Sequence, residues 1–243
     1  MAVYSLPYMP GKMRKSATNE PQLRAASDQS LLVSFGRQIT LEHHQSVVKL
    51  LRLLQSEPIE GIRNLHPAYC SLLIKFDPIK LDHDELEAGL LPCLARLETT
   101  TPTPRQIEIP VCYGGEFGPD LSDVATMHGM SPARAVELHC SPIYVVYFLG
   151  FAPGFGYLGG LPEALASPRL ETPRAKVPQG SVGIGGNQTA IYPFATPGGW
   201  RLIGRTPLAM FCRERTPMSL LQIGDQVRFR AISKEEFGEL NAK

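Results

Sequence analysis

Three glycines near the middle of the chain have the spacing of a dinucleotide-binding turn. The segment 148–163 reads FLGFAPGFGYLGGLPE, and Gly154, Gly156 and Gly159 within it form the pattern G-x-G-x-x-G. In an NAD-binding fold, such a turn leads from a strand into a helix whose N-terminal amides hold the pyrophosphate. Here the prolines that follow leave room for at most about two helical turns. The residues therefore predict a glycine-rich turn after a strand, and no NAD site.

A second glycine-rich segment and a run of basic residues suggest anion binding. The turn GSVGIGGNQT, residues 180–189, can bring several backbone amides together, although no Lys-Ser/Thr follows it as in a P-loop. Tight turns between strands account for the same glycines equally well. Between residues 166 and 215 the chain has seven basic and two acidic side chains, in a protein of net charge +1. This excess suggests an acidic substrate, a phosphate or an acidic partner, with a merely solvated surface as the alternative.

Cysteine and histidine spacing gives no pattern for a metal site or a disulfide. The five cysteines are widely spread without a C-x-x-C pair, and the six histidines form no H-x-x-x-H pair. His139 and Cys140 are adjacent, but sequence neighbours rarely face each other, so a nucleophilic pair is not favoured. We therefore expect no metal and a reducing, cytoplasmic location. The near-neutral charge and the lack of a long apolar run give no indication of nucleic-acid or membrane binding.

The first part of the chain predicts an α+β domain. Thr40 and Asp82 are good N-caps, and an apolar pattern with helical spacing follows Thr40. The order β-α-β-β-α is the ferredoxin-like pattern, and nothing in it indicates catalysis. The expected elements are a strand over 30–36, a helix over 41–56, two strands around a turn near His66-Pro67, a helix over 83–98, and RQIEIPVCY (105–113) as an available closing strand.

The second part predicts a mostly β domain. TTTPTP at 99–104 reads as a linker, and two helices are expected between residues 121 and 140, the second capped by Ser131. Beyond Ile143, short apolar runs are broken every few residues by Gly or Pro, which favours short strands in a barrel or sandwich. We therefore expect a flexible arm (1–28), an α+β domain (29–104) and a β-barrel domain with two leading helices (105–243).

Six motifs together resemble a known family over about residues 31 to 232. They are PAYCSLLIKFDP, IPVCYGGEFGPDL, GFAPGFGYLGGLP, TPRAKVPQGSVGIGGNQTAIYP, PGGWRLIGRTP and IGDQVRF. The family is the B subunit of bacterial 5-oxoprolinase, also called allophanate hydrolase subunit 1 or the Kip-type kinase-inhibitor family. The resemblance implies a ferredoxin-like domain followed by a cyclophilin-like β-barrel. It also implies a complex with two partners, a homologous C subunit and a separate A subunit. This complex opens 5-oxoproline to L-glutamate with hydrolysis of ATP, together with Mg²⁺.

The resemblance also implies roles for single residues, although it identifies no catalytic residue. Cations would neutralise phosphate or carboxylate, glycines and polar residues would shape a turn at a cleft, and aromatic residues would wall that cleft, with Phe155 and Tyr157 lining either the cleft or the contact with the C subunit. The cations are Arg174, Lys176 and Arg205; the turn residues are Gly185, Gly186, Gln188 and Thr189; the aromatic residues are Phe155, Tyr157, Tyr192 and Trp200. Because Arg174 and Lys176 lie in a proline-bounded segment, we expect their loss to change stability by at most about 0.5 kcal/mol.

The family resemblance is also compatible with two other functions. Members of the family inhibit a sensor histidine kinase through the barrel domain. The same two domains also form the carboxyltransferase part of biotin-dependent urea-type enzymes. For the oxoprolinase we expect a site shared with the C subunit, because the chain offers cations, amides and aromatic residues but no evident base paired with a nucleophile and no Walker-type loop.

Overall fold

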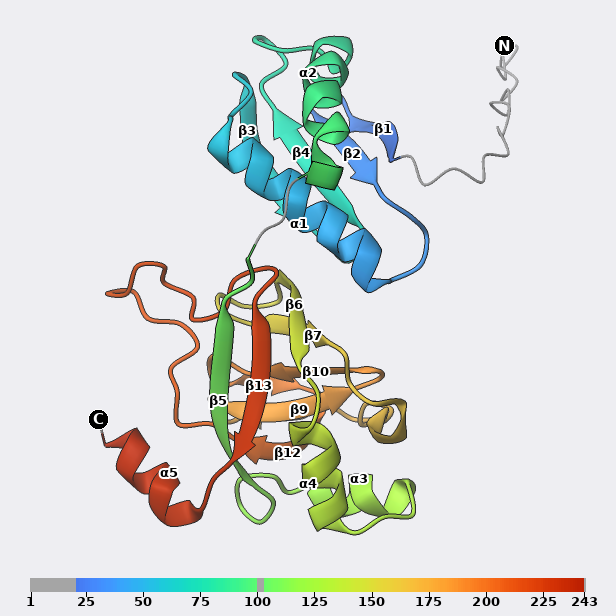
Figure 1. Ribbon diagram of the computed structural model, residues 1–243. Coiled ribbons are helices and arrows are strands. Elements are labelled where there is room, and N and C mark those ends of the chain that lie inside the picture. Colours follow the sequence, from blue (N-terminus) through green and yellow to red (C-terminus); the bar gives the residue numbers. More distant parts are fainter. Residues whose placement is uncertain (1–20, 100–102, 243) are drawn as a thin grey trace, which may run out of the picture.

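The computed structural model describes residues 21–99 and 103–242, which form an antiparallel sheet with two helices and a closed β-barrel. Figure 1 shows the sheet domain above the barrel, and β5 begins at the end of the barrel that is nearer to the sheet. This is the expected α+β architecture. No helix in the described part of the chain is long and apolar enough to cross a membrane.

The sheet domain packs two helices against four strands. The Thr40 hydroxyl accepts a bond from the amide of His43 at 3.1 Å, and Asp82 forms a capping box with Glu85, so both predicted N-caps are confirmed. The core contains apolar residues of both helices and of the two central strands. The elements are β1 (Gln22–Ser27), β2 (Ser30–Ser34), α1 (Leu41–Ser56), β3 (Ile62–Pro67), β4 (Ser71–Phe76) and α2 (His83–Ala95), and the strand order is β1-β2-β4-β3.

The edge of this sheet differs from the expectation. Gln22–Ser27, which we assigned to a flexible arm, forms β1 and pairs with β2, so that assignment is wrong from residue 22 onward. The rest of the expected arm, residues 1–20, lies outside the described residues. The segment RQIEIPVCY does not close the sheet, because β5 (Gln106–Tyr113) belongs to the barrel. Burial explains why β1, and not β5, forms the edge strand of the sheet. Ile109–Cys112 of β5 is buried on both faces, whereas β1 is almost wholly exposed, as suits an edge strand.

Seven strands close the barrel in the order β10-β7-β6-β13-β5-β12-β9. Strands β5 and β13 pair in parallel, and the other pairs are antiparallel. A separate ribbon joins β8 to β11. The elements are β6 (Tyr144–Leu149), β7 (Gly156–Gly159), β8 (Arg174–Val177), β9 (Ser181–Gly185), β10 (Gln188–Ile191), β11 (Thr196–Gly198), β12 (Arg201–Arg205), β13 (Gln226–Ala231), α3 (Leu121–Met127), α4 (Pro132–Cys140) and α5 (Lys234–Asn241).

The glycines of the G-x-G-x-x-G pattern lie in an antiparallel hairpin. Gly156 and Gly159 are the ends of β7, which pairs with β6 and β10, and Gly154 lies in the turn before it. The only helical segment that follows closely is a short 3-10 turn at Glu163–Leu165. This arrangement is not the strand–helix unit of a dinucleotide site.

Aromatic side chains connect the sheet domain to the barrel. Tyr69 donates its hydroxyl proton to Gln188 Oε1 at 2.9 Å. The Tyr69 ring also meets Phe148 edge to face, with ring centroids 4.9 Å apart. His44 of α1 meets Tyr147 in the same way at 4.7 Å. The two domains therefore share packed and hydrogen-bonded contacts beside β6 and β10.

Candidate functional site

Three of the four aromatic residues that we expected to wall a cleft are buried in a small core of their own. Phe155, Tyr192 and Trp200 are 2%, 2% and 5% exposed. Phe155 packs edge to face against both Tyr192 and Trp200, and the three cluster with Val177, Ala190 and Leu202 between the barrel and the β8–β11 ribbon. Tyr157 differs, because it is only partly buried and stacks on Phe148 with centroids 4.5 Å apart. Of the four, Tyr157 alone offers substantial surface to a ligand in this conformation.

The glycine turn is shaped by packing. A Cβ on Gly185 would lie 2.5 Å from the Trp200 ring, so only glycine lets this strand pass beneath the indole. Gly186 has φ of +66°, which favours glycine, and its amide donates to the carbonyl oxygen of Ser167 at 2.8 Å. Because this amide already donates to Ser167, it is not available to bind an anion. The segment is therefore better explained as a tight turn between two strands than as an anion-binding loop.

Thr189 belongs to a buried chain of hydrogen bonds inside the barrel. Its hydroxyl donates to the carbonyl oxygen of Gly183 at 3.0 Å, so it accepts from His139 Nε2, which lies 3.1 Å away. His139 Nδ1 then accepts from the Tyr113 hydroxyl at 2.8 Å. Burial lowers the pKa of His139 to about 3, so the ring is neutral at physiological pH.

His139 and the neighbouring thiol of Cys140 do not form a catalytic pair. Cys140 Sγ lies 3.5 Å from the Tyr113 hydroxyl, and burial raises the pKa of this thiol. His139 is fully buried and reaches Cys140 only through Tyr113. The sequence had no signal for Tyr113, which links α4 to β5. The geometry therefore gives His139, Cys140 and Tyr113 a role in the packing of the barrel.

A second histidine contact also lacks the geometry of a nucleophile and its base. His128 Nε2 lies 3.1 Å from the Ser167 hydroxyl. Ser167, however, is 1% exposed and donates its proton to the carbonyl oxygen of Leu165 at 2.9 Å. The hydroxyl is therefore an acceptor from the histidine and is closed to a substrate.

Arg174 is held in an ion pair with a buried carboxylate. Its Nη2 lies 2.6 Å from Asp120 Oδ1, and Asp120 Oδ2 accepts the amide of Leu202 at 2.7 Å. Asp120 is 5% exposed and precedes α3, so the pair fastens β8 to α3 and β12. This contact corrects the expectation that Arg174 lies on a free loop, and we therefore expect its removal to cost more than about 0.5 kcal/mol, the limit anticipated from the sequence. The partners are 54 positions apart, so the sequence gave no signal for the pair.

The remaining predicted side chains are more accessible. Lys176 is exposed and makes no ion pair within the described residues. Arg205 is half-buried, and its Nε donates to the carbonyl oxygen of Gln179 at 2.7 Å. The sequence did not single out Arg169, whose guanidinium lies 5.5 Å from the Trp200 ring centre and remains exposed.

A small group of polar side chains lies where the sheet domain meets the barrel. We call this group the rim, and its members are Tyr69, Tyr157, Arg169 and Gln188. Tyr69 comes from the sheet domain and the others from the barrel, and the charge of Arg169 acts on Tyr69. Burial raises the pKa of Tyr69, which keeps its phenol protonated as a hydrogen-bond donor. The rim therefore offers phenol and amide groups beside one cation, which suit a carbonyl or carboxylate. No group of three or more His, Cys, Asp or Glu that would hold a metal lies within residues 21–99 and 103–242.

An exposed apolar turn lies between β6 and β7. Phe151 is 63% exposed and has φ of +67°, an uncommon value for a bulky residue. The amide of Ala152 donates to the carbonyl oxygen of Gly150 at 2.8 Å and closes a strained three-residue turn around Phe151. Leu149 beside it is 38% exposed. In this turn Phe151 is the accessible aromatic, whereas Phe155, which the sequence favoured, faces the core.

Comparison with known proteins places these features in a family. The model of the carboxyltransferase domain, subdomain C and D, matches residues 21–221. The B subunit of 5-oxoprolinase from Bacillus subtilis is 39% identical over 227 residues, which cover 89% of this chain and 95% of that protein.

Solved structures extend the comparison. The crystal structure of TTHA0988 superposes with a TM-score of 0.75 at 35% identity, over 85% of this chain and 40% of that one. This chain thus spans about two-fifths of TTHA0988. The urea amidolyase of K. lactis has the same fold, with a TM-score of 0.69 at 21% identity over 93% of this chain and 16% of that one. The chain therefore belongs to the family of the carboxyltransferase domain, subdomains C and D, and is related to the B subunit of 5-oxoprolinase over both of its domains.

Proposed function

We propose that this chain is the B subunit of an ATP-dependent 5-oxoprolinase, the hydrolase complex that opens 5-oxoproline to L-glutamate. The observation that carries the proposal is 39% identity over 95% of the B. subtilis protein, which includes the sheet domain as well as the barrel. The chemistry needs more than one component. A lactam carbonyl is a poor electrophile, and transfer of phosphate from ATP to its oxygen activates the ring carbon. Water then adds to that carbon, the C–N bond of the ring breaks as the nitrogen takes up a proton, and hydrolysis of the resulting acyl phosphate releases phosphate and the carboxylate.

In this proposal the rim contributes binding groups to a site shared with another protein of the complex. The amide nitrogen of Gln188 and the Tyr157 hydroxyl offer hydrogen bonds to the lactam or its carboxylate, Tyr69 orients Gln188 through its own hydroxyl proton, and Arg169 offers the positive charge. Lys176 is exposed and makes no ion pair within the described residues, and its charge suits the transferred phosphate. Neither histidine–hydroxyl contact of the barrel supplies a base in this proposal, because His139 is fully buried and the Ser167 hydroxyl beside His128 is closed to a substrate. Proton transfer and the ATP–Mg²⁺ complex are therefore assigned to the A and C subunits.

The Phe151 turn is the proposed contact with the C subunit. In TTHA0988 the region similar to this chain is 40% of a longer polypeptide, so this fold also occurs joined to a larger remainder. As a B subunit, the role proposed here, the chain needs a surface that takes the place of that covalent link. Phe151 and Leu149 are exposed, and the strained backbone holds the Phe151 side chain outward where it would bury apolar area in an interface.

The experiment combines this chain with the A and C subunits of the complex and measures L-glutamate released from 5-oxoproline and ATP. With the wild-type chain we expect turnover. Phe151→Asp should lower it at least about tenfold when the three proteins are at limiting concentrations, because a charge enters an apolar interface. Ile79→Asp is the matched control, since Ile79 is 94% exposed at the far end of the sheet domain.

The outcomes separate the two parts of the proposal. Absence of turnover with the wild-type chain and both partners contradicts the function itself. Wild-type turnover that Phe151→Asp leaves unchanged contradicts the docking surface alone. Far-UV circular dichroism of both variants checks that the exposed substitutions leave the fold intact.

A further inference from the structure

A cavity of about 560 Å³ lies between α1 and the barrel, apart from the rim and from the Phe151 turn. It borders a close contact of the two domains, because a Cβ on Gly224 would lie 3.1 Å from Val48 Cγ1 of α1. The volume is in the range of small-molecule sites. The cavity is lined by Leu41, His44, Gln45, Val48, Lys49, Arg52, Thr103, Pro104, Arg105, Val145, Ile223, Gly224, Asp225 and Gln226.

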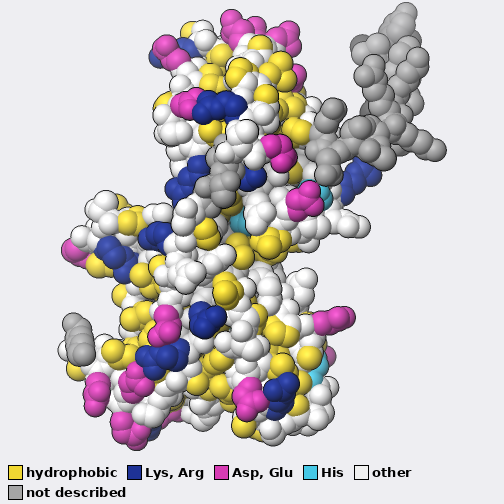
Figure 2. All heavy atoms as spheres, in the orientation of Figure 1, with side chains coloured by type: hydrophobic (Ala, Val, Ile, Leu, Met, Phe, Trp, Pro, Cys, Tyr) yellow, Lys and Arg dark blue, Asp and Glu magenta, His cyan; other side chains and the backbone are white. Residues whose placement is uncertain are grey.

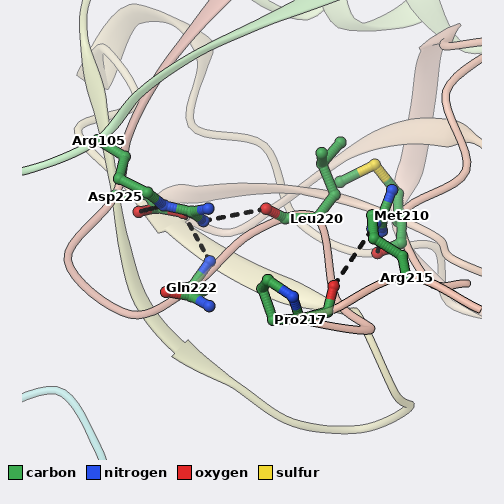
Figure 3. A network of polar contacts seen from close by, with 7 residues as sticks. All are labelled: Arg105, Met210, Arg215, Pro217, Leu220, Gln222 and Asp225. Atoms are coloured by element: carbon green, nitrogen blue, oxygen red, sulfur yellow. Dashed lines mark hydrogen bonds and ion pairs between the residues drawn. The ribbon is translucent and has the colours of Figure 1, made fainter. Parts of the chain in front are cut away.

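The charges that line the cavity are unbalanced. Asp225 is its only acidic residue, and both of its oxygens are used: Arg105 Nε lies 2.9 Å from Oδ1, and the amide of Gln222 lies 2.6 Å from Oδ2. Figure 3 shows Arg105 and Asp225 side by side in this network, with a further bond from Arg105 to the carbonyl oxygen of Leu220. Arg105 and Asp225 therefore neutralise each other.

Lys49 and Arg52 remain without an acidic partner within the described residues. Burial lowers the pKa of His44 to about 4, so this histidine adds no charge near pH 7. The lining thus carries a net charge of about two positive units from neighbouring turns of α1. Figure 2 shows Lys and Arg side chains at the lower end of the sheet domain, near the barrel.

The rest of the lining suits the body of a small organic molecule. Val48 and Leu41 of α1 face Val145 and Ile223 of the barrel across the cavity, and Gln45 and Gln226 add amide groups. Apolar walls with a few convergent polar groups are the usual composition of a ligand site.

We propose that this cavity binds a small organic dianion, whose negative groups meet Lys49 and Arg52 while its apolar part lies against Val48, Val145 and Ile223. A dicarboxylate and a phosphate ester share this chemistry. Bound between α1 and the barrel, the ligand would contact both domains at once. The inference does not depend on the proposed oxoprolinase activity.

The test is isothermal titration calorimetry of the full chain with three probes: glutarate, ADP and inorganic phosphate. We expect at least one probe to bind with a Kd below about 1 mM, and more weakly as NaCl is raised from 50 to 300 mM. The double variant Lys49→Gln/Arg52→Gln should weaken that binding at least tenfold. The control is Arg24→Gln/Lys75→Gln, which removes two exposed cations from β1 and β4 outside the cavity.

Each result decides the proposal. Glutarate binding assigns the site to dicarboxylates, and ADP or phosphate binding assigns it to phosphate groups. The proposal is overturned if no probe binds, or if the two double variants weaken binding equally, because the charge effect is then not local to the cavity. Thermal unfolding of both variants verifies that they are folded.

Discussion

Replacement of Asp120 by alanine is expected to destabilise the protein by about 3 kcal/mol. Asp120 is 5% exposed, and its two oxygens hold Arg174 of β8 and the backbone amide of Leu202 of β12. The variant leaves a buried amide without an acceptor and a largely buried guanidinium without its counter-charge. Arg174→Ala should cost less, about 2 kcal/mol, because Asp120 keeps its bond to Leu202 and part of the Arg174 side chain faces solvent.

Urea unfolding followed by tryptophan fluorescence measures these changes, since Trp200 packs beside β8 and β12. Glu108→Ala is the matched control, because Glu108 forms a solvent-exposed ion pair with Arg230 at 2.8 Å, and the loss of such a pair should change the free energy of unfolding little. An Asp120→Ala variant no less stable than the Glu108→Ala variant would contradict the structural role given to the pair.

Acidification below pH 6.5 should destabilise the protein through its two buried histidines. Burial lowers the pKa of His44 from 6.5 to about 4 and that of His139 to about 3. Between these values and 6.5 the unfolded chain binds protons that the folded chain does not, so stability is complete above pH 6.5 and falls as the pH falls. Each histidine contributes a slope of up to about 1.4 kcal/mol per pH unit.

The His44→Phe variant isolates one of these contributions. Phenylalanine keeps an aromatic ring against Tyr147 and removes the titrating group. Between pH 6.5 and pH 4 the variant should lose about 3 kcal/mol less stability than the wild type, while its carboxylates titrate in the same way. Urea unfolding at half-unit pH steps gives both curves. Parallel curves for variant and wild type would show that His44 is not held neutral by the fold.

Local signals explain which parts of the fold the sequence predicted. The N-caps Thr40, Asp82 and Ser131 each lie beside the helix that they begin, so short-range hydrogen bonding decides those boundaries. Strand β1 was missed because only Leu23 of its six residues contacts the core, and an edge strand needs no apolar alternation. Strand β5 was read ambiguously because its pairing with β13 joins residues about 120 positions apart.

The same distinction applies to the site. The composition of the glycine turn indicated its shape, but the indole that Gly185 accommodates comes from Trp200, beyond the next two strands. A lone tryptophan flanked by glycines reads equally as a cleft wall or as part of a core, and only the packing of Phe155 and Tyr192 decides for the core. Likewise, no pattern in the sequence pairs Tyr69 with Gln188, because the bond joins two domains.

We propose that this chain supplies an essential part of a 5-oxoprolinase whose site is completed by other proteins of the complex. The most direct test is the initial rate of 5-oxoproline-dependent phosphate release from ATP, with the chain alone, with the C subunit, with the A subunit, or with both. We predict no release above background from the chain alone, and release with equal formation of L-glutamate when all three are present. Omission of this chain from the full mixture should abolish the activity. Release by the chain alone, or full activity of the A and C subunits without it, would contradict the account.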